Sequence, residues 1–276
     1  MLGSYVMSNL SIPETVRAPL NFSSNRKRSG RWSNIYDDRI DLNVDSRLVD
    51  VIDARSLDQA TSLEREGLVL TQAPLGQYDW FNANWVDNVY IPSCVNLVEA
   101  LTGVRAFSYH GAYFRIADPD TRSRLHASRL ARFVHIDQTR VTLEKSAAEF
   151  AGQMSIKGYR RAVVYNVWRS ISMPPQDAPL AVCDQRTVNP SDFVEGDVAD
   201  AADAAQAAPY TGSVYSADQR WYYFSNMSPD EALVFKGVDT AITEPLGCLH
   251  SAFDHPSPGE NPVPRSSVEC RIIAFY

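Results

Sequence analysis

The sequence has few of the residues that mark disulfide-rich, membrane-spanning or metal-ribbon proteins. Its 276 residues contain four cysteines, none of them in a CxxC pair: Cys94, Cys183, Cys248 and Cys270. Neither a disulfide framework nor a zinc ribbon is therefore predicted. No apolar run approaches the length of a membrane span, and the N-terminus lacks the apolar segment of a signal peptide. We therefore expect a protein of the reducing cytoplasm, with no membrane partner.

Positive charge is scarce as well. The formal net charge is −7, and the one short basic run is "SNRKRSGR" near the N-terminus. Proteins that bind nucleic acids usually present a basic face, so no nucleic-acid partner is predicted. We interpret the basic run as part of a solvated arm.

Aromatic residues and prolines are plentiful, with 13 Tyr, 11 Phe and 16 Pro. This composition favours short strands and turns. One helix is predicted to end at Gly103 and another to cover "TLEKSAAEFAGQM", and the runs "SRLVDVIDARSL" and "ATSLEREGLVLTQAP" suggest a short helix and a strand. The second half reads as many short strands, so we expect a mostly β (α+β) protein with a jelly-roll core and flanking helices. We expect a single domain over residues 1–276, an irregular N-terminal arm at 1–45 and a mobile loop at 196–212.

The run "VHIDQT" holds His135 and Asp137 two residues apart. Alternate residues of a strand point to the same face, so the imidazole and the carboxylate lie on one side. Such a pair is either a surface ion pair or two ligands of a metal. His250 in "EPLGCLHSAFDHP" is the favoured third ligand, and His255 is the alternative. Two histidines and one carboxylate form the facial triad of non-haem Fe(II) oxygenases.

A third element follows the late histidine. Arg265 and Ser267 form an RxS pair in the terminal "PRSSVECRIIAFY". A guanidinium with a neighbouring hydroxyl suits a carboxylate such as the distal end of 2-oxoglutarate. Arg271 is an alternative for this role. The order HxD, His, RxS is typical of a 2-oxoglutarate-dependent oxygenase built on a double-stranded β-helix, the cupin-like form of the jelly roll.

Several longer runs strengthen this interpretation: "NVWRSI", "PLAVCDQRTV", "YYFSNMSPDEALVFKGVDT", "LHSAFDHP" and "PRSSVECRIIAF". Together with "VHIDQT" they resemble the AsaB-like and CmcJ-like hydroxylase/desaturase family, which includes a fungal gibberellin desaturase and aziridine-forming amino-acid oxygenases. The resemblance covers about residues 100 to 276. It implies Fe(II), with 2-oxoglutarate and O2 as co-substrates. It also implies that His135, Asp137 and His250 are the iron ligands and that Arg265 binds 2-oxoglutarate.

One position departs from the family pattern. The sequence reads "PRSS" where the family commonly reads "PRES". Ser266 points away from the face that Arg265 and Ser267 share, so the arginine is expected to keep its role.

Further polar and aromatic residues are candidates for the pocket. Asn166 is a candidate for binding 2-oxoglutarate, and five residues are candidates for binding substrate: Trp168, Arg169, Arg271, Ile273 and Phe275. The polar residues among them need partners inside apolar strands, which either a ligand or a structural network supplies. Lys236 raises the same question. Tyr109, His110 and Tyr113 are interpreted as sheet residues, with the mouth of the pocket as the alternative.

The resulting hypothesis is a secondary-metabolism oxygenase that hydroxylates a small carboxylated or amino-acid-like molecule. An arginine beyond Arg265, either Arg169 or Arg271, suggests the anionic group. Desaturation or C–N ring closure to an aziridine is the alternative outcome. An inactive ligand-binding relative and a metal hydrolase or isomerase that needs no 2-oxoglutarate also remain open.

Overall fold

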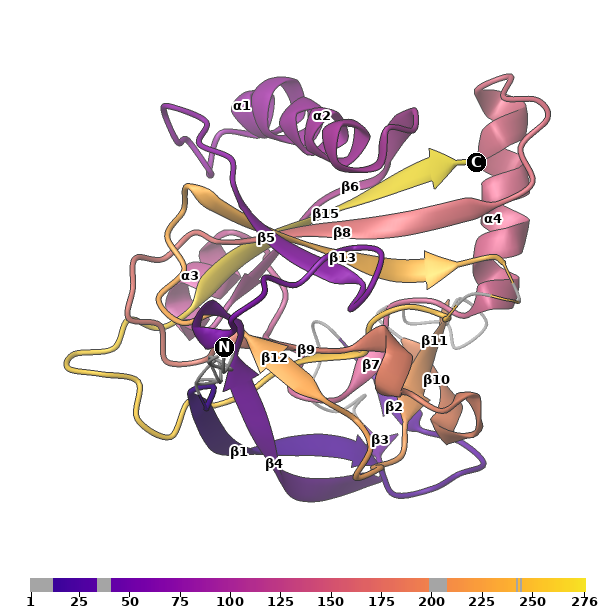
Figure 1. Cartoon of the computed structure of the whole chain (residues 1–276). Coiled ribbons are helices and arrows are strands. Elements are labelled where there is room, and N and C mark those ends of the chain that lie inside the picture. Colours follow the sequence, from indigo (N-terminus) through magenta and orange to yellow (C-terminus); the bar gives the residue numbers. More distant parts are fainter. Residues whose placement is uncertain (1–11, 34–40, 199–207, 242, 244) are drawn as a thin grey trace, which may run out of the picture.

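The computed structural model describes residues 12–33, 41–198, 208–241, 243 and 245–276. Two sheets face each other, as Figure 1 shows. In the described part of the chain, the larger sheet contains, in spatial order, β1 (Thr15–Ser23), β4 (Val44–Asp53), β12 (Trp221–Tyr223), β9 (Leu180–Cys183), β14 (His250–Ala252), β7 (His135–Ile136), β11 (Ala208–Ser213), β10 (Phe193–Val198), β2 (Gly30–Trp32) and β3 (Asp41–Leu42).

The smaller sheet lies above the larger one in Figure 1. Its strands are, in order, β5 (Leu68–Gln72), β13 (Glu231–Asp239), β8 (Ala162–Ser170), β15 (Ser266–Phe275) and β6 (Ala106–Ile116). All its neighbouring strands pair antiparallel. Short 3-10 turns occur at η2 (Ala54–Ser56), η4 (Gln185–Thr187) and η5 (Pro190–Asp192).

A continuous helical segment covers the outer face of the smaller sheet (Figure 1). It runs through α1 (Ala83–Trp85), the π-helical turn η3 (Val86–Tyr90) and α2 (Ile91–Thr102). Cys94 and Val98 are buried on one face of α2, four residues apart, as an amphipathic helix requires. Gly103 ends the helix at φ 68°, a conformation that glycine adopts without steric cost. The predicted helix and its end are confirmed.

Helix α4 (Arg140–Gln153) stands at one end of the two sheets, and the short α3 (Pro119–Arg124) lies at the other (Figure 1). Thr139 caps α4, because its hydroxyl accepts a hydrogen bond from the Thr142 N–H. Leu143 and Ala147 of α4 join the core between the sheets. This confirms the second predicted helix and places its start beside Asp137.

Strand β8 is buried on both faces along its whole length. Its Val163, Tyr165 and Val167 pack outward against the helical segment. Val164 and Trp168 belong instead to the clusters between the sheets. Asn166 has the same strand parity, so it too points toward the space where the site lies.

The expectation of an irregular arm at residues 1–45 is wrong for the part that the structure describes. Strand β1 pairs with β4 over its whole length and carries the buried Ala18, Leu20 and Phe22. The apolar residues of β1 do alternate in the sequence, but the polar residues around them obscure this strand pattern. Residues 1–11 and 34–40 lie outside the described residues.

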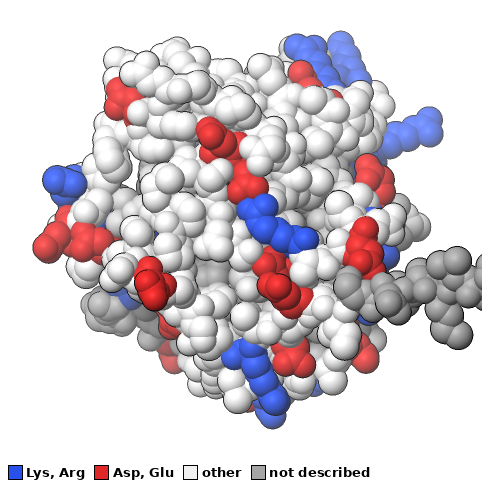
Figure 2. All heavy atoms as spheres, turned by 60° about the vertical axis from the view of Figure 1, so that its left-hand side comes forward, with Lys and Arg blue, Asp and Glu red and all other residues white. Residues whose placement is uncertain are grey.

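The arginines of the basic run are exposed, as expected of a solvated segment, but two of them also bind the larger sheet or the turn η5 that leads into it. Arg26 donates to the Ser191 carbonyl, and Arg28 forms an ion pair with Asp197 of β10. Both ends of the predicted loop at 196–212 are strand, in β10 and β11, and residues 199–207 lie outside the described residues. On the face drawn in Figure 2, acidic and basic side chains are interspersed among uncharged ones.

Candidate active site

Two adjacent strands bring three candidate metal ligands together. His135 of β7 and His250 of β14 are directly paired residues of the larger sheet, and Asp137 follows β7. Each imidazole Nε2 lies 3.7 Å from one carboxylate oxygen of Asp137. One ligand atom from each residue lies within 4.8 Å of the others. A cation between these atoms would therefore be held on one side only, as in a facial triad.

The two imidazoles are oriented for metal binding. His135 Nδ1 lies 2.9 Å from the Phe133 carbonyl, and His250 Nδ1 lies 3.2 Å from the Cys248 carbonyl. A carbonyl can only accept, so each Nδ1 carries a proton, which turns each Nε2 toward Asp137 and leaves it as the nitrogen available to a metal. Burial, followed by the neighbouring His250, lowers the pKa of His135 to about 3, which keeps that ring neutral.

Both oxygens of Asp137 have a protein partner. Arg271 Nη2 donates to Oδ1 at 2.6 Å, and Asn166 Nδ2 donates to Oδ2 at 2.8 Å. Burial alone would raise the pKa of Asp137. The guanidinium of Arg271 instead holds that pKa well below its usual range. The carboxylate is thus anionic and fixed in orientation, so the set of two nitrogens and one oxygen fits Fe(II).

A narrow cavity next to the triad is lined by Arg265, Trp168 and both histidines. Arg265 is 1% exposed, and its Nη1 donates to the Ala178 carbonyl at 2.8 Å. Its Nε has no hydrogen-bond partner in the described part of the chain, where Arg265 also forms no ion pair with a carboxylate. Burial, then Arg115 and Arg132, lower the pKa of Arg265 to about 9. Asp177 and Asp254 act in the opposite direction, but neither forms an ion pair with this guanidinium. A buried guanidinium without a directly paired carboxylate fits an anionic ligand.

The other predicted members of the co-substrate site take different positions. Ser267 is buried, but its hydroxyl donates to the Arg115 carbonyl at 3.3 Å. Asn166 donates a hydrogen bond to Asp137. Its position therefore supports a role in orienting this metal ligand rather than in binding 2-oxoglutarate. Trp168, a candidate for binding substrate, instead lines the narrow cavity, where its ring centroid lies 5.6 Å from the Arg265 guanidinium.

The sequence reasoning missed Arg115. This residue of β6 is paired with Ser267 of β15, and it lines both the narrow cavity and a larger neighbouring one. Its Nη1 donates to the Arg129 carbonyl at 3.0 Å. No motif in the sequence marks Arg115, because only the register between β6 and β15 brings it to the site.

Three residues predicted to bind substrate do not reach the site. Arg169 points to the outer face of β8, where it donates to the carbonyls of Pro229 and Ala73. Ile273 belongs to the core between the sheets, and Phe275 packs on Phe107 and Phe150 near α4. The predictions for Arg169, Ile273 and Phe275 are therefore corrected.

Arg271 does border the larger cavity, but it is bonded to two carboxylates, Asp137 and Glu269. Tyr109, His110 and Tyr113 also line that cavity, in agreement with the alternative interpretation of these residues. Lys236 is buried near Asp239, and it lines neither the narrow nor the larger cavity.

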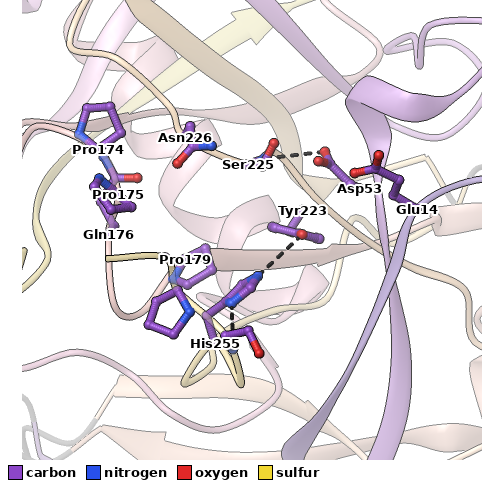
Figure 3. Close-up of a pocket in the computed structure, with 13 residues that line it drawn as sticks. Glu14, Asp53, Pro174, Pro175, Gln176, Pro179, Tyr223, Ser225, Asn226 and His255 are labelled. Carbon is purple, nitrogen blue, oxygen red and sulfur yellow. Dashed lines mark hydrogen bonds between the residues drawn. The ribbon is translucent and has the colours of Figure 1, made fainter. Parts of the chain in front are cut away.

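His255, the alternative metal ligand, lies in a separate cleft (Figure 3). Its Nε2 is 3.4 Å from the Tyr223 hydroxyl, and prolines such as Pro175 and Pro179 line the same cleft. His250 lies next to Asp137 and His135, whereas His255 does not. This supports His250 as the third ligand.

Comparisons with known proteins agree with this geometry. The family model described as YDMC, Oxidoreductase/YMDC permease-like domain, matches residues 12–275. The chain belongs to this family. Among its relatives, the hydroxylase/desaturase efuI of Hormonema carpetanum is 29% identical over 262 residues, covering 85% of each protein. The hydroxylase/desaturase asaB of Aspergillus flavus is 35% identical over 132 residues, covering 42% of this chain and 56% of asaB. The predicted hydroxylase/desaturase family is confirmed.

A further relative is the Fe(II)/2-oxoglutarate-dependent dioxygenase nvfI of Aspergillus novofumigatus. It is 28% identical over 191 residues, covering 69% of this chain and 67% of nvfI. A solved structure of the iron and alpha-ketoglutarate-dependent endoperoxidase NvfI superposes with a TM-score of 0.77 at 22% identity. The match covers 96% of this chain and 99% of that one, and it confirms the predicted jelly-roll fold. Within the described residues, the helices are too short or too polar to cross a bilayer.

Proposed function

We propose that the protein is a non-haem Fe(II)/2-oxoglutarate-dependent oxygenase of secondary metabolism, formed by the whole chain as one domain. The observation that carries this proposal is the position of Arg265. A buried guanidinium with no carboxylate partner among the described residues borders the same narrow cavity as His135 and His250. A metal site alone does not require this arginine, whereas a dicarboxylate co-substrate beside the metal does.

Each residue of the site has a defined task. His135 and His250 present Nε2, and Asp137 adds the negative charge that balances Fe(II). Arg265 holds the distal carboxylate of 2-oxoglutarate, so the co-substrate is oriented as well as bound. Iron and 2-oxoglutarate, when bound, supply the activated oxygen that removes a hydrogen atom from an unactivated C–H bond of the substrate.

The surrounding chain keeps these groups in place. Phe133 stacks on the His135 ring at a centroid distance of 4.4 Å, and Phe235 lies 4.9 Å from the His250 ring. Asn166 and Arg271 fix the carboxylate of Asp137. The triad side chains are at most 8% exposed, so the protein excludes most water from the ligand atoms.

Hydroxylation is the proposed outcome, with desaturation or ring closure as the alternative, since all three begin with removal of the same hydrogen atom. The expectation of a carboxylated or amino-acid-like substrate rested on Arg169 or Arg271. Arg169 lies outside the site and Arg271 is bonded to two carboxylates, so neither supports that expectation. The four cysteines are buried and free, which supports the proposed cytoplasmic location.

The test is a calorimetric titration of 2-oxoglutarate into protein loaded with Mn(II). The proposal predicts binding that requires both the metal and Arg265, so Arg265→Ala binds the metal but not 2-oxoglutarate. Arg17→Ala removes an arginine whose side chain is 72% exposed and serves as the control. Metal binding without 2-oxoglutarate binding in the unmodified protein would favour a metal hydrolase or isomerase. Binding of neither would favour an inactive relative.

A further inference from the structure

A second, larger cavity adjoins the metal site. Its volume is about 620 Å³, within the range of sites that take drug-sized ligands. His135, Asp137 and Arg271 form part of its lining, and both His135 and Arg115 also line the narrow cavity of Arg265. A molecule in this cavity would lie directly against the candidate metal ligands. It is therefore the place for the substrate of the proposed reaction.

Aromatic rings form the side of this cavity that belongs to the larger sheet. Trp32 and Phe133 have ring centroids 4.5 Å apart, and Phe133 and Tyr210 have centroids 5.3 Å apart. Phe133 in turn stacks on the metal ligand His135. These rings form a continuous apolar surface that ends at the metal site, which suits contact with rings of a ligand.

The smaller sheet supplies further rings from β6. Tyr109 and His110 have ring centroids 3.9 Å apart, and both line the cavity. Tyr113 is 40% exposed, and the Arg271 guanidinium lies 5.0 Å from its ring centroid. The cavity is thus bounded by aromatic side chains from both sheets.

The two arginines that line the cavity already have partners in the protein. Asp137 is the sole carboxylate among the described lining residues, and it belongs to the metal site. Arg271 is bonded to Asp137 and Glu269, and Arg115 donates to the Arg129 carbonyl. Among the described lining residues, an ammonium group would find no carboxylate besides Asp137. A carboxylate would have to compete with two existing partners of Arg271, and burying an unpaired charge is costly.

The side-chain amide of Gln138, which lines the cavity, has one hydrogen-bonding atom without a partner among the described residues. Gln138 Nε2 donates to the Tyr109 hydroxyl at 3.3 Å, while Gln138 Oε1 is buried without a partner in the described part of the chain. Whichever way this amide is turned, one of its polar atoms is left over. Because Gln138 lines the cavity, a small rotation of its side chain would bring this atom to a hydroxyl or carbonyl of a ligand.

We infer that the substrate is an uncharged, ring-containing molecule of drug-like size that carries a hydroxyl or carbonyl beside Gln138. This inference rests on the proposed function and names the substrate class of the same site. It replaces the amino-acid-like substrate, whose two charged groups the cavity does not match.

Equilibrium dialysis of protein loaded with Mn(II) and 2-oxoglutarate tests this class without turnover. The probes are uncharged hydroxyflavanones and hydroxysteroids on one side and free amino acids on the other. The ring compounds are expected to bind and the amino acids are not. Tyr113→Ala should weaken ring binding roughly tenfold. Phe81→Ala removes another exposed aromatic, which lines none of the cavities of the site, and should leave binding unchanged.

A second comparison isolates Gln138. Gln138→Ala should weaken the binding of a hydroxylated probe by roughly three- to tenfold more than it weakens the binding of the parent compound without the hydroxyl. Preference for amino acids, or binding of neither class, overturns the inference. Retention of 2-oxoglutarate is measured in the same samples. If it is retained while amino acids are preferred, the inference fails and the proposed function stands. If the ring compounds bind but 2-oxoglutarate does not, the cavity takes the inferred class and the proposed function fails.

Discussion

Arg271 and Asp137 form a buried ion pair in which Nη2 lies 2.6 Å from Oδ1, at the place where the candidate metal is held. The same guanidinium reaches Glu269 through Nε at 3.0 Å. One cation thus balances two buried carboxylates in the metal-free protein. Removing it should leave both uncompensated.

Arg271→Leu is therefore expected to lower the free energy of unfolding of the metal-free protein by about 3–5 kcal/mol. Added Mn(II) should restore part of that loss, because the metal compensates Asp137. Thermal unfolding with and without Mn(II) measures this, and the metal-induced rise in Tm should be larger in the variant than in the unmodified protein.

Arg161→Leu provides the matched control. Arg161 pairs with the buried Asp239 away from the triad, so its loss should also reduce stability. The metal-induced rise in Tm should then equal that of the unmodified protein. A larger rise in both variants would show that the effect is not specific to Asp137.

Asn166→Ala should weaken metal binding by roughly ten- to a hundredfold, because the amide that orients Asp137 is lost. Val164→Ala, on the same face of β8, also truncates a buried side chain but leaves the carboxylate untouched. Mn(II) titrations followed by electron paramagnetic resonance compare the two. Equal losses of affinity would mean that general destabilisation, not the hydrogen bond, is responsible.

The two late histidines should behave differently. His250→Ala should abolish specific Mn(II) binding, because it removes the Nε2 atom that lies 3.7 Å from the Asp137 carboxylate. His255→Ala should retain it, since His255 lies in the separate cleft with Tyr223. The same titration measures both variants, and loss of binding in His255→Ala would reassign the third ligand.

The sequence alone predicted the family, the jelly roll and the three residues that the triad brings together. Short motifs achieved this because HxD and RxS depend on strand alternation, which is local. Arg169 was misplaced for a related reason. Both faces of β8 are buried, so its apolar pattern does not reveal which face points to the site.

Distance along a strand caused the second error. Ile273 and Phe275 were assigned to the site because they share strand parity with Arg265. At about 3.4 Å per residue, Phe275 lies roughly 30 Å further along β15, at the α4 end of the core. Arg115 was missed because its place depends on the register between β6 and β15, which no local pattern specifies.

The most direct test of the central claim is an anaerobic optical titration. Fe(II) and then 2-oxoglutarate are added to the metal-free protein while the weak visible charge-transfer band of the Fe(II)–2-oxoglutarate chelate is followed. The band should form in the unmodified protein and be lost in His135→Ala. In Arg265→Ala it should form only at much higher 2-oxoglutarate concentrations. Iron binding without the band, or a band unaffected by Arg265→Ala, would contradict the assignment of the co-substrate site.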